Sequence, residues 1–266
     1  MQPLVINVAD LSQTATRLWW PMLRIGGFIA TAPLVSASAV PARVRIVMTL
    51  ALVVLIAPLA PQPVNLSIFS GSGFLAAIQE MLIGIAIGMV VQMAFEALTL
   101  AGQTAAMTMG LGFATLVDPQ HGANTTVVGQ LFMVFATLIY LAVNGHLVLL
   151  GALANSFQTL PIGAPNIDKN FLWAVATWGA SIFETGLLIA LPAVIALVIV
   201  NMALGVVTRA APQLNLFGVG FPITMMAGYF VLFVGSDGIM VGISSLIHNS
   251  LVAAAALVSP GPAGVP

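Results

Sequence analysis

Residues 185–208 read TGLLIALPAVIALVIVNMALGVVT, a run without a single charged side chain. An α-helix needs about 20 mainly apolar residues to cross a bilayer, and this run is long enough. Similar uncharged runs cover residues 46–79, 119–167, 210–236 and 238–266. Because these runs are continuously apolar and lack the alternation of a barrel strand, they predict membrane helices.

The composition of the whole chain supports the same conclusion. Of its 266 residues, 60% are hydrophobic and 5% are charged, whereas an ordinary soluble domain is about 25% charged. A surface with so few charges does not stay dispersed in water, so most of it must face lipid or other protein. The sequence therefore predicts an all-α, polytopic membrane protein and excludes a soluble enzyme.

Six helical segments are expected, near residues 12–36, 44–60, 73–103, 127–157, 170–208 and 216–256. The last two exceed one simple span and contain Pro192 and Pro222. Proline inside a helix removes a hydrogen bond, so we expect these two segments to be kinked or folded into hairpins. No internal repeat and no soluble domain is visible. We expect one helical domain over residues 1–258 and a disordered tail at 259–266.

The sequence offers no catalytic or metal site. It has no cysteine, which excludes disulfides and thiolate chemistry. Its histidines, His121, His146 and His248, lie in different segments without the spacing of metal ligands. No nucleophile is paired with a base, and a net charge of −1 gives no footprint for nucleic acid. We therefore expect no catalytic residue, no metal and no cofactor.

Small and polar residues recur at every fourth position of the segment at 73–103. The stripe is formed by Ala76, Glu80, Gly84, Gly88, Gln92 and Glu96. Small residues at this spacing let helices approach closely, and polar residues bond across the contact. A carboxylate in hydrocarbon needs a partner or water. We therefore assign the last five residues of the stripe to buried contacts with other helices or subunits; the alternative is a proton or ion path.

Glycines interrupt the helical pattern shortly after this stripe. The stretch 107–118 is apolar yet contains Gly110 and Gly112, and Pro119 follows Asp118. A non-helical backbone at membrane depth must be buried in protein or line a cavity. We favour a cavity-lining loop over an ordinary interhelical loop. Its candidate residues are Met107, Met109, Gly110, Leu111, Gly112, Phe113 and Asp118.

Several short motifs follow one another in a fixed order along residues 15–250. They are Pro21-Met22-Leu23-Arg24, Ala32-Pro33-Leu34, Met109-Gly110-Leu111-Gly112-Phe113-Ala114-Thr115, Val117-Asp118-Pro119, Asn144-Gly145-His146, Thr159-Leu160-Pro161-Ile162-Gly163, Asn201-Met202-Ala203-Leu204-Gly205, Arg209-Ala210-Ala211-Pro212-Gln213-Leu214-Asn215 and Gly220-Phe221-Pro222. In this order and spacing they resemble the FliR family of flagellar type III export-gate subunits. The motif at 117–119 looks more like the flagellar branch than like its injectisome counterpart.

The resemblance implies a non-enzymatic subunit of a gate that passes unfolded flagellar proteins across the bacterial inner membrane at the flagellar basal body. FliP and FliQ subunits would share its complex, with FlhB and FlhA nearby. Residues 107–118 would plug the closed pore. A hairpin turn on the cytoplasmic side would contain Asn201, Arg209, Pro212, Gln213 and Asn215. Members of this family stand partly above the bilayer, so the hydrophobic segments need not all be simple spans.

Two other classes of protein share parts of this pattern. A secondary transporter or small-solute channel would also be helical and glycine-rich, but transporters often contain paired broken segments, and none is convincing here. A membrane-embedded enzyme would need an acid, a base and a nucleophile that the sequence does not present.

Overall fold

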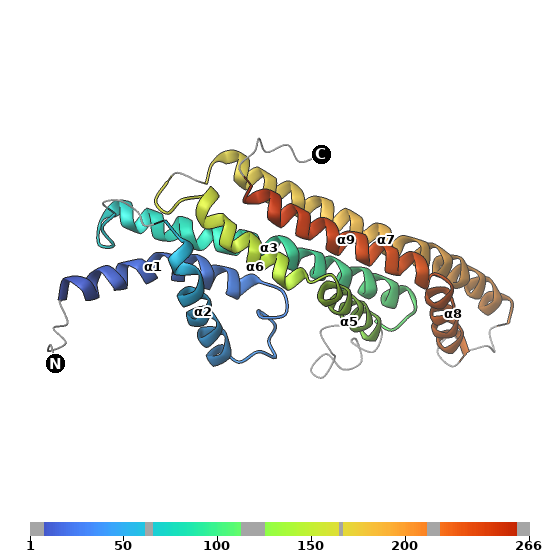
Figure 1. Cartoon of the computed structure of the whole chain (residues 1–266). Coiled ribbons are helices and arrows are strands. Elements are labelled where there is room, and N and C mark those ends of the chain that lie inside the picture. Colours follow the sequence, from blue (N-terminus) through green and yellow to red (C-terminus); the bar gives the residue numbers. More distant parts are fainter. Residues whose placement is uncertain (1–7, 62–65, 113–125, 165–166, 212–218, 260–266) are drawn as a thin grey trace. The chain divides into compact units, whose positions relative to one another are not determined.

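The computed structural model describes residues 8–61, 66–112, 126–164, 167–211 and 219–259. Every regular element in these ranges is a helix, and none is a strand (Figure 1). The all-α prediction is therefore confirmed. The helices are α1 (Val8–Thr31), α2 (Ala42–Ile56), η1 (Ala57–Leu59), α3 (Gly71–Thr108), α5 (Val127–Ala142), α6 (Gly145–Thr159), α7 (Lys169–Ala210), α8 (Phe221–Val234) and α9 (Ser236–Leu257).

Three of these helices begin at a polar side chain that accepts a hydrogen bond from the first turn. The hydroxyl of Ser70 accepts from the Gly73 amide at 3.0 Å, and that of Thr126 accepts from the Gly129 amide at 3.2 Å. The carboxylate of Asp168 accepts from the Phe171 amide at 2.7 Å. Such caps satisfy amides that have no partner inside the helix, which fixes the starts of α3, α5 and α7.

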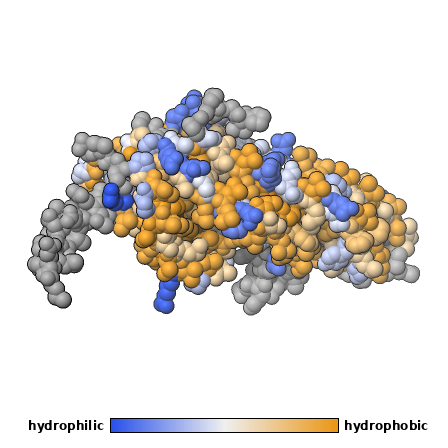
Figure 2. All heavy atoms as spheres, viewed as in Figure 1, coloured by the Kyte–Doolittle hydropathy of each residue, from blue (hydrophilic) through white to orange (hydrophobic). Residues whose placement is uncertain are grey.

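Within the described ranges, four helices are long and apolar enough to cross a membrane: α2 extended by η1, α3, α7 and α9. The pair α5 and α6 raises this number to five when it is taken as one span. Apolar side chains cover most of the face seen in Figure 2. The chain is accordingly a multi-pass membrane protein.

The segment expected at 127–157 is not one helix. It is divided into two helices, α5 and α6, with Val143 and Asn144 between them. Asn144 lies at the break with a φ of 55°, in the left-handed region that asparagine tolerates better than most residues. The prediction of a continuous helix was wrong here, because the apolar residues on both sides outweighed the Asn144-Gly145 pair, which is typical of turns.

The two long proline-containing segments also differ from the prediction. The helix α7 continues through Pro192 as a single element, so the hairpin expected there is wrong, while a kink at Pro192 stays a prediction. Pro222 lies in the first turn of α8, where a missing N–H breaks no helical hydrogen bond. It starts a helix rather than bending one, and the expected kink at Pro222 is wrong. The break in this segment falls at Gly235, between α8 and α9.

The chain forms two compact units. The first unit consists of Met1–Gln92, Asn144–Gly179 and Ser250–Pro266, and the second of Met93–Val143 and Ala180–Asn249. The helices α3, α7 and α9 each contribute residues to both units. The single domain expected over residues 1–258 stays a prediction.

Each unit has its own apolar core. In the first unit, large fully buried side chains come from α1, α3 and α6, and include Trp20, Ile25, Ile83, Ile87, Leu153 and Phe157. In the second unit, a cluster of buried residues joins the end of α3 to α5 and α7, and includes Ala105, Met109, Phe132, Ala190 and Leu197. The candidate sites described next lie beside these two cores.

Candidate functional site

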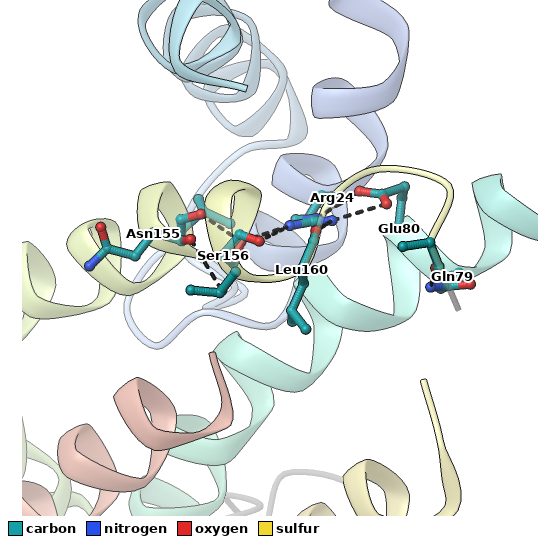
Figure 3. A network of polar contacts seen from close by, with 9 residues as sticks. Arg24, Gln79, Glu80, Asn155, Ser156 and Leu160 are labelled. Atoms are coloured by element: carbon teal, nitrogen blue, oxygen red, sulfur yellow. Dashed lines mark hydrogen bonds and ion pairs between the residues drawn. The ribbon is translucent and has the colours of Figure 1, made fainter. Parts of the chain in front are cut away.

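A fully buried ion pair links α1 to α3 in the first unit. The Arg24 Nε lies 2.7 Å from one carboxylate oxygen of Glu80, and Nη2 donates to the other oxygen at 3.0 Å. Both side chains are 0% exposed. The planar guanidinium thus meets the carboxylate with two parallel hydrogen bonds, the strongest geometry for such a pair (Figure 3).

The remaining donors of Arg24 are used at the end of α6. Nη1 donates to the Ser156 carbonyl oxygen at 2.7 Å and to its hydroxyl at 3.0 Å, and Nη2 donates to the Leu160 carbonyl oxygen at 2.8 Å. The guanidinium carbon lies 4.3 Å from the centre of the Phe157 ring, a cation–π distance. All five N–H groups of the guanidinium therefore have acceptors, and three separate helices are tied at one point.

The motif at residues 159–163 lies beside this network. The Gln79 side-chain amide, one residue before Glu80, donates to the Ala164 carbonyl oxygen. Gly163 has a φ of +82°, a conformation that L side chains rarely adopt. The connection after α6 is thus held by α1 at Leu160 and by α3 at Ala164, on the two sides of its glycine turn.

The two glycines of the stripe on α3, Gly84 and Gly88, face α1. A Cβ added at Gly84 would lie 2.8 Å from the Arg24 carbonyl carbon, and one at Gly88 would lie 2.8 Å from the Ala32 amide nitrogen. The hydroxyl of Thr31 donates across the same contact to the Ile85 carbonyl oxygen at 3.1 Å. The backbones of α1 and α3 therefore approach so closely that only glycine fits.

This contact decides between the two kinds of partner expected for three stripe residues. Glu80, Gly84 and Gly88 pack against α1 of the same chain, so their buried contact is with another helix rather than with another subunit. The sequence pattern identified a close helix contact but not its partner. Gln92 is half-buried in the first unit, and Glu96 is exposed in the second. Their assignment to subunit packing stays a prediction.

The end of α3 is held by two side chains in the second unit. The Asn201 side-chain amide on α7 donates to the Thr108 carbonyl oxygen at 2.9 Å. The Thr224 hydroxyl on α8 donates to the Met109 carbonyl oxygen at 3.2 Å. The last carbonyl groups of a helix have no N–H partner within that helix. The bonds from α7 and α8 supply such partners and fix the point at which the predicted loop begins.

The turn that follows α3 requires glycine. Gly110 has a φ of +85°, and a Cβ there would lie 2.6 Å from the Phe221 ring. Met109 is 0% exposed and its side chain packs against Gly228 of α8, where a Cβ would lie 2.6 Å from the methionine methyl group. Met109 is therefore a core residue rather than a plug residue, which corrects its assignment.

The other residues of the predicted loop divide between surface and core. Met107 is 65% exposed, whereas Leu111 is partly buried against the core cluster of the second unit. Gly112 is half-buried. Phe113 and Asp118 lie outside the described residues. Of the loop residues that the structure describes, Met107 alone has an exposed side chain.

The predicted hairpin-turn residues are only partly described. Asn201 lies on α7, where it bonds to the end of α3, and Arg209 is exposed in the last turn of α7. Pro212, Gln213 and Asn215 lie outside the described residues. Among the residues that are described, no three His, Cys, Asp or Glu side chains come together as a metal site would need.

Known proteins resemble this chain over most of its length. The family model described as bacterial export proteins, family 1, matches residues 15–250. The flagellar biosynthetic protein FliR of Pectobacterium carotovorum subsp. carotovorum is 40% identical over 86% of this chain and 87% of its own length. The FliR protein of Escherichia coli K12 is 40% identical over 79% of this chain and 80% of its own.

A relative from a third bacterium is less similar in sequence but matches over as much of the chain. The flagellar biosynthetic protein FliR of Bacillus subtilis strain 168 is 33% identical over 86% of this chain and 89% of its own length. The family match over residues 15–250 includes the segments that carry the buried ion pair, the glycine contact and the end of α3. The chain belongs to the FliR family of flagellar export components, within family 1 of the bacterial export proteins.

Proposed function

We propose that this chain is a subunit of the flagellar type III export gate, which passes unfolded proteins across the bacterial inner membrane at the flagellar basal body. Its family gives it a role in flagellar export. The observation that carries the proposal is the match over residues 15–250 with relatives named as flagellar biosynthetic proteins. Several membrane-spanning helices support the location.

The gate would contain FliP and FliQ subunits, with FlhB and FlhA nearby. A large apolar surface on α7 supports assembly with such neighbours. Only 17% of an apolar 18-residue stretch of this helix is buried inside the chain, and the exposed side chains include Leu187, Leu188, Ile195, Ile199, Met202 and Val206. Membership in a family of export components supports protein rather than lipid as the cover of part of this surface.

The stretch 107–118 would close the pore of this gate. Its base is supported by the bonds from Asn201 and Thr224, and Gly110, with its positive φ, follows the end of α3. An apolar constriction excludes water and ions when narrow, yet does not hold a passing chain strongly. Exposed Met107 suits this role because methionine is bulky and deformable.

We propose no catalytic role for the chain. The carboxylate of Glu80 bonds to Arg24 through both of its oxygens and is 0% exposed, so it acts as the counter-ion of Arg24 and is shielded from solvent. The same pairing argues against a proton path along the stripe of α3, because proton transfer would leave the Arg24 charge buried and unpaired.

The plug is tested by changing its composition while keeping its anchors. Residues 113–117 are replaced by glycine and serine at the same length, which leaves Met109 and Gly110 in place. A second variant is Met107→Ala, and its control is Met226→Ala, an exposed methionine on α8. The complex should assemble normally, while ion conductance of cells or bilayers should rise severalfold in the first variant and less in the second.

Two measurements make this result interpretable. Recovery of partner subunits with the tagged chain shows whether assembly is intact, and single-channel or dye-uptake recording shows whether the pore is sealed. If the variant with residues 113–117 replaced assembles and its pore conducts no more than the wild-type pore, this stretch is not the seal. A Met226→Ala complex as leaky as Met107→Ala would remove Met107 from the plug.

A further inference from the structure

An open groove of about 360 Å³ lies between α1 and α2 in the first unit. Its walls are apolar and come from Met22 and Ile29 on α1 and from Ile46 and Leu50 on α2. Ligand sites in proteins have volumes of about 300–1,000 Å³ and are mostly apolar with a few polar groups. In this groove the charged group is Arg45.

The guanidinium of Arg45 is only partly satisfied by the chain. Its Nη2 donates to the carbonyl oxygens of Ser36 and Ala37 at 3.1 and 2.6 Å. Its Nε is shielded from solvent and has no hydrogen-bond partner within the described residues. A buried donor without an acceptor is unfavourable, and within the described residues Nη1 of the same guanidinium also makes no hydrogen bond, so Arg45 has donors to offer an anionic oxygen in the groove.

No acidic residue of the surrounding segments balances this charge. The sequence has no Asp or Glu between Asp10 and Glu80, and Glu80 is already paired with Arg24. Arg43 is exposed two residues before Arg45. The start of α2 therefore has two positive charges for which the described chain supplies no carboxylate.

The rest of α2 is apolar and faces outward. Val47, Val54 and Leu55 are 65%, 68% and 70% exposed, and only 17% of the candidate span Ala42–Leu59 is buried. The helix thus has positive charge at one end and exposed hydrocarbon along its length. A phospholipid in a bilayer has the matching distribution, with its charged headgroup above its acyl chains.

We propose that the groove between α1 and α2 binds an anionic phospholipid. Its phosphate would lie at Arg45 and Arg43, and one acyl chain would lie along Met22, Ile29, Ile46 and Leu50. The inference does not depend on the export gate, because it rests only on contacts within the first unit. A helix of a partner protein that brings a carboxylate to Arg45 is the competing occupant, and the experiment distinguishes the two.

The test is native mass spectrometry of the full chain in mild detergent, titrated with phosphatidylglycerol or with phosphatidylcholine of the same acyl chains. The chain should retain phosphatidylglycerol preferentially. Each arginine near an anionic lipid contributes about a fivefold effect on binding, so Arg45→Gln and Arg43→Gln should each weaken retention about fivefold. Arg17→Gln, an exposed arginine of α1, is the matched control and should leave retention unchanged.

A second variant fills the groove without changing charge. Gly26 lines the groove, and a Cβ there has no atom within 4 Å, so Gly26→Leu should fold and displace the acyl chain. Gly151→Leu is its control, because Gly151 also has open space around it. We expect Gly26→Leu to lose phosphatidylglycerol severalfold while Gly151→Leu keeps it.

The proposal can be tested even if one of the variants fails to fold. Equal retention of the two lipids by wild type, or Gly26→Leu retaining phosphatidylglycerol like Gly151→Leu, overturns it. Displacement of bound lipid by soluble glycerol phosphate would show that the acyl groove is not involved and would also overturn it. Crosslinking from position 46 to a partner protein, with no lipid retained, would assign the groove to that protein.

Discussion

At the scale of single residues, the stability of the first unit depends on charge balance at Arg24. This side chain and Glu80 are both 0% exposed, and each is the other's counter-ion. Removing one member of a buried pair leaves an uncompensated charge and costs about 3–5 kcal/mol, whereas replacing both by apolar residues is often nearly neutral. The pair is therefore more sensitive to single than to double substitution.

We expect Arg24→Met and Glu80→Leu each to lower the unfolding temperature of the detergent-solubilised chain strongly. The double variant Arg24→Met/Glu80→Leu should recover much of this loss, because it contains no unpaired buried charge. Arg17→Met, on the exposed part of the same helix, should have little effect. Fluorescence-detected size-exclusion after heating measures all four. A double variant as unstable as the sum of the single losses would contradict the prediction.

The sequence predicts part of this site. Glu80 in an apolar helix must have a partner, and Arg24 is the basic residue nearest to the middle of the first apolar segment. Their pairing nevertheless joins positions 56 residues apart, and no local pattern relates two helices at that separation. The acceptors at Ser156 and Leu160 are mostly backbone oxygens, which every residue has, so the sequence contains no signal for them.

At the scale of elements, the close contact of α1 with α3 depends on glycine at positions 84 and 88. We expect Gly84→Ala to prevent normal accumulation of the chain, because the added carbon meets the backbone of α1, which cannot move aside as a side chain can. Gly71→Ala at the start of α3 is the control, since a Cβ there has open space. Equal yield and equal protease resistance of the two variants would show that the helices separate readily at this contact.

Helix identity and helix ends differ in how well they follow from sequence. Uncharged apolar runs predict the helices because a membrane helix must satisfy its own backbone. The break at Asn144 was missed because it depends on one backbone conformation, a φ of 55°. The role of Pro222 was misplaced because proline favours both a kink and a first turn. The structure distinguishes the two, because α7 ends at Ala210 and Pro222 lies in the first turn of a new helix.

At the scale of the whole molecule, an exposed acid on a long apolar helix indicates that lipid is not its only neighbour. Glu184 is exposed on α7, next to Phe183 at 49% exposure and near Leu187 and Leu188 at 51% and 58%. A charged side chain within hydrocarbon costs about 2.5–3.5 kcal/mol on insertion scales, so it requires water or a polar partner. A neighbouring subunit with a basic or amide side chain would provide that partner and cover the apolar residues around it.

We therefore expect Glu184→Leu to fold but to lose its partners. The substitution removes a charge from an exposed position, so the unfolding temperature of the isolated chain should not fall, while the amounts of the proposed partners FliP and FliQ recovered with the tagged chain should drop severalfold. Arg17→Leu removes an exposed charge outside the candidate spans and should leave recovery unchanged. Mass measurement of the detergent-solubilised complexes reports the loss directly. If Glu184→Leu recovered both subunits at the wild-type ratio, water or lipid headgroups would satisfy this carboxylate, and the outer face of α7 would not be where the subunits meet.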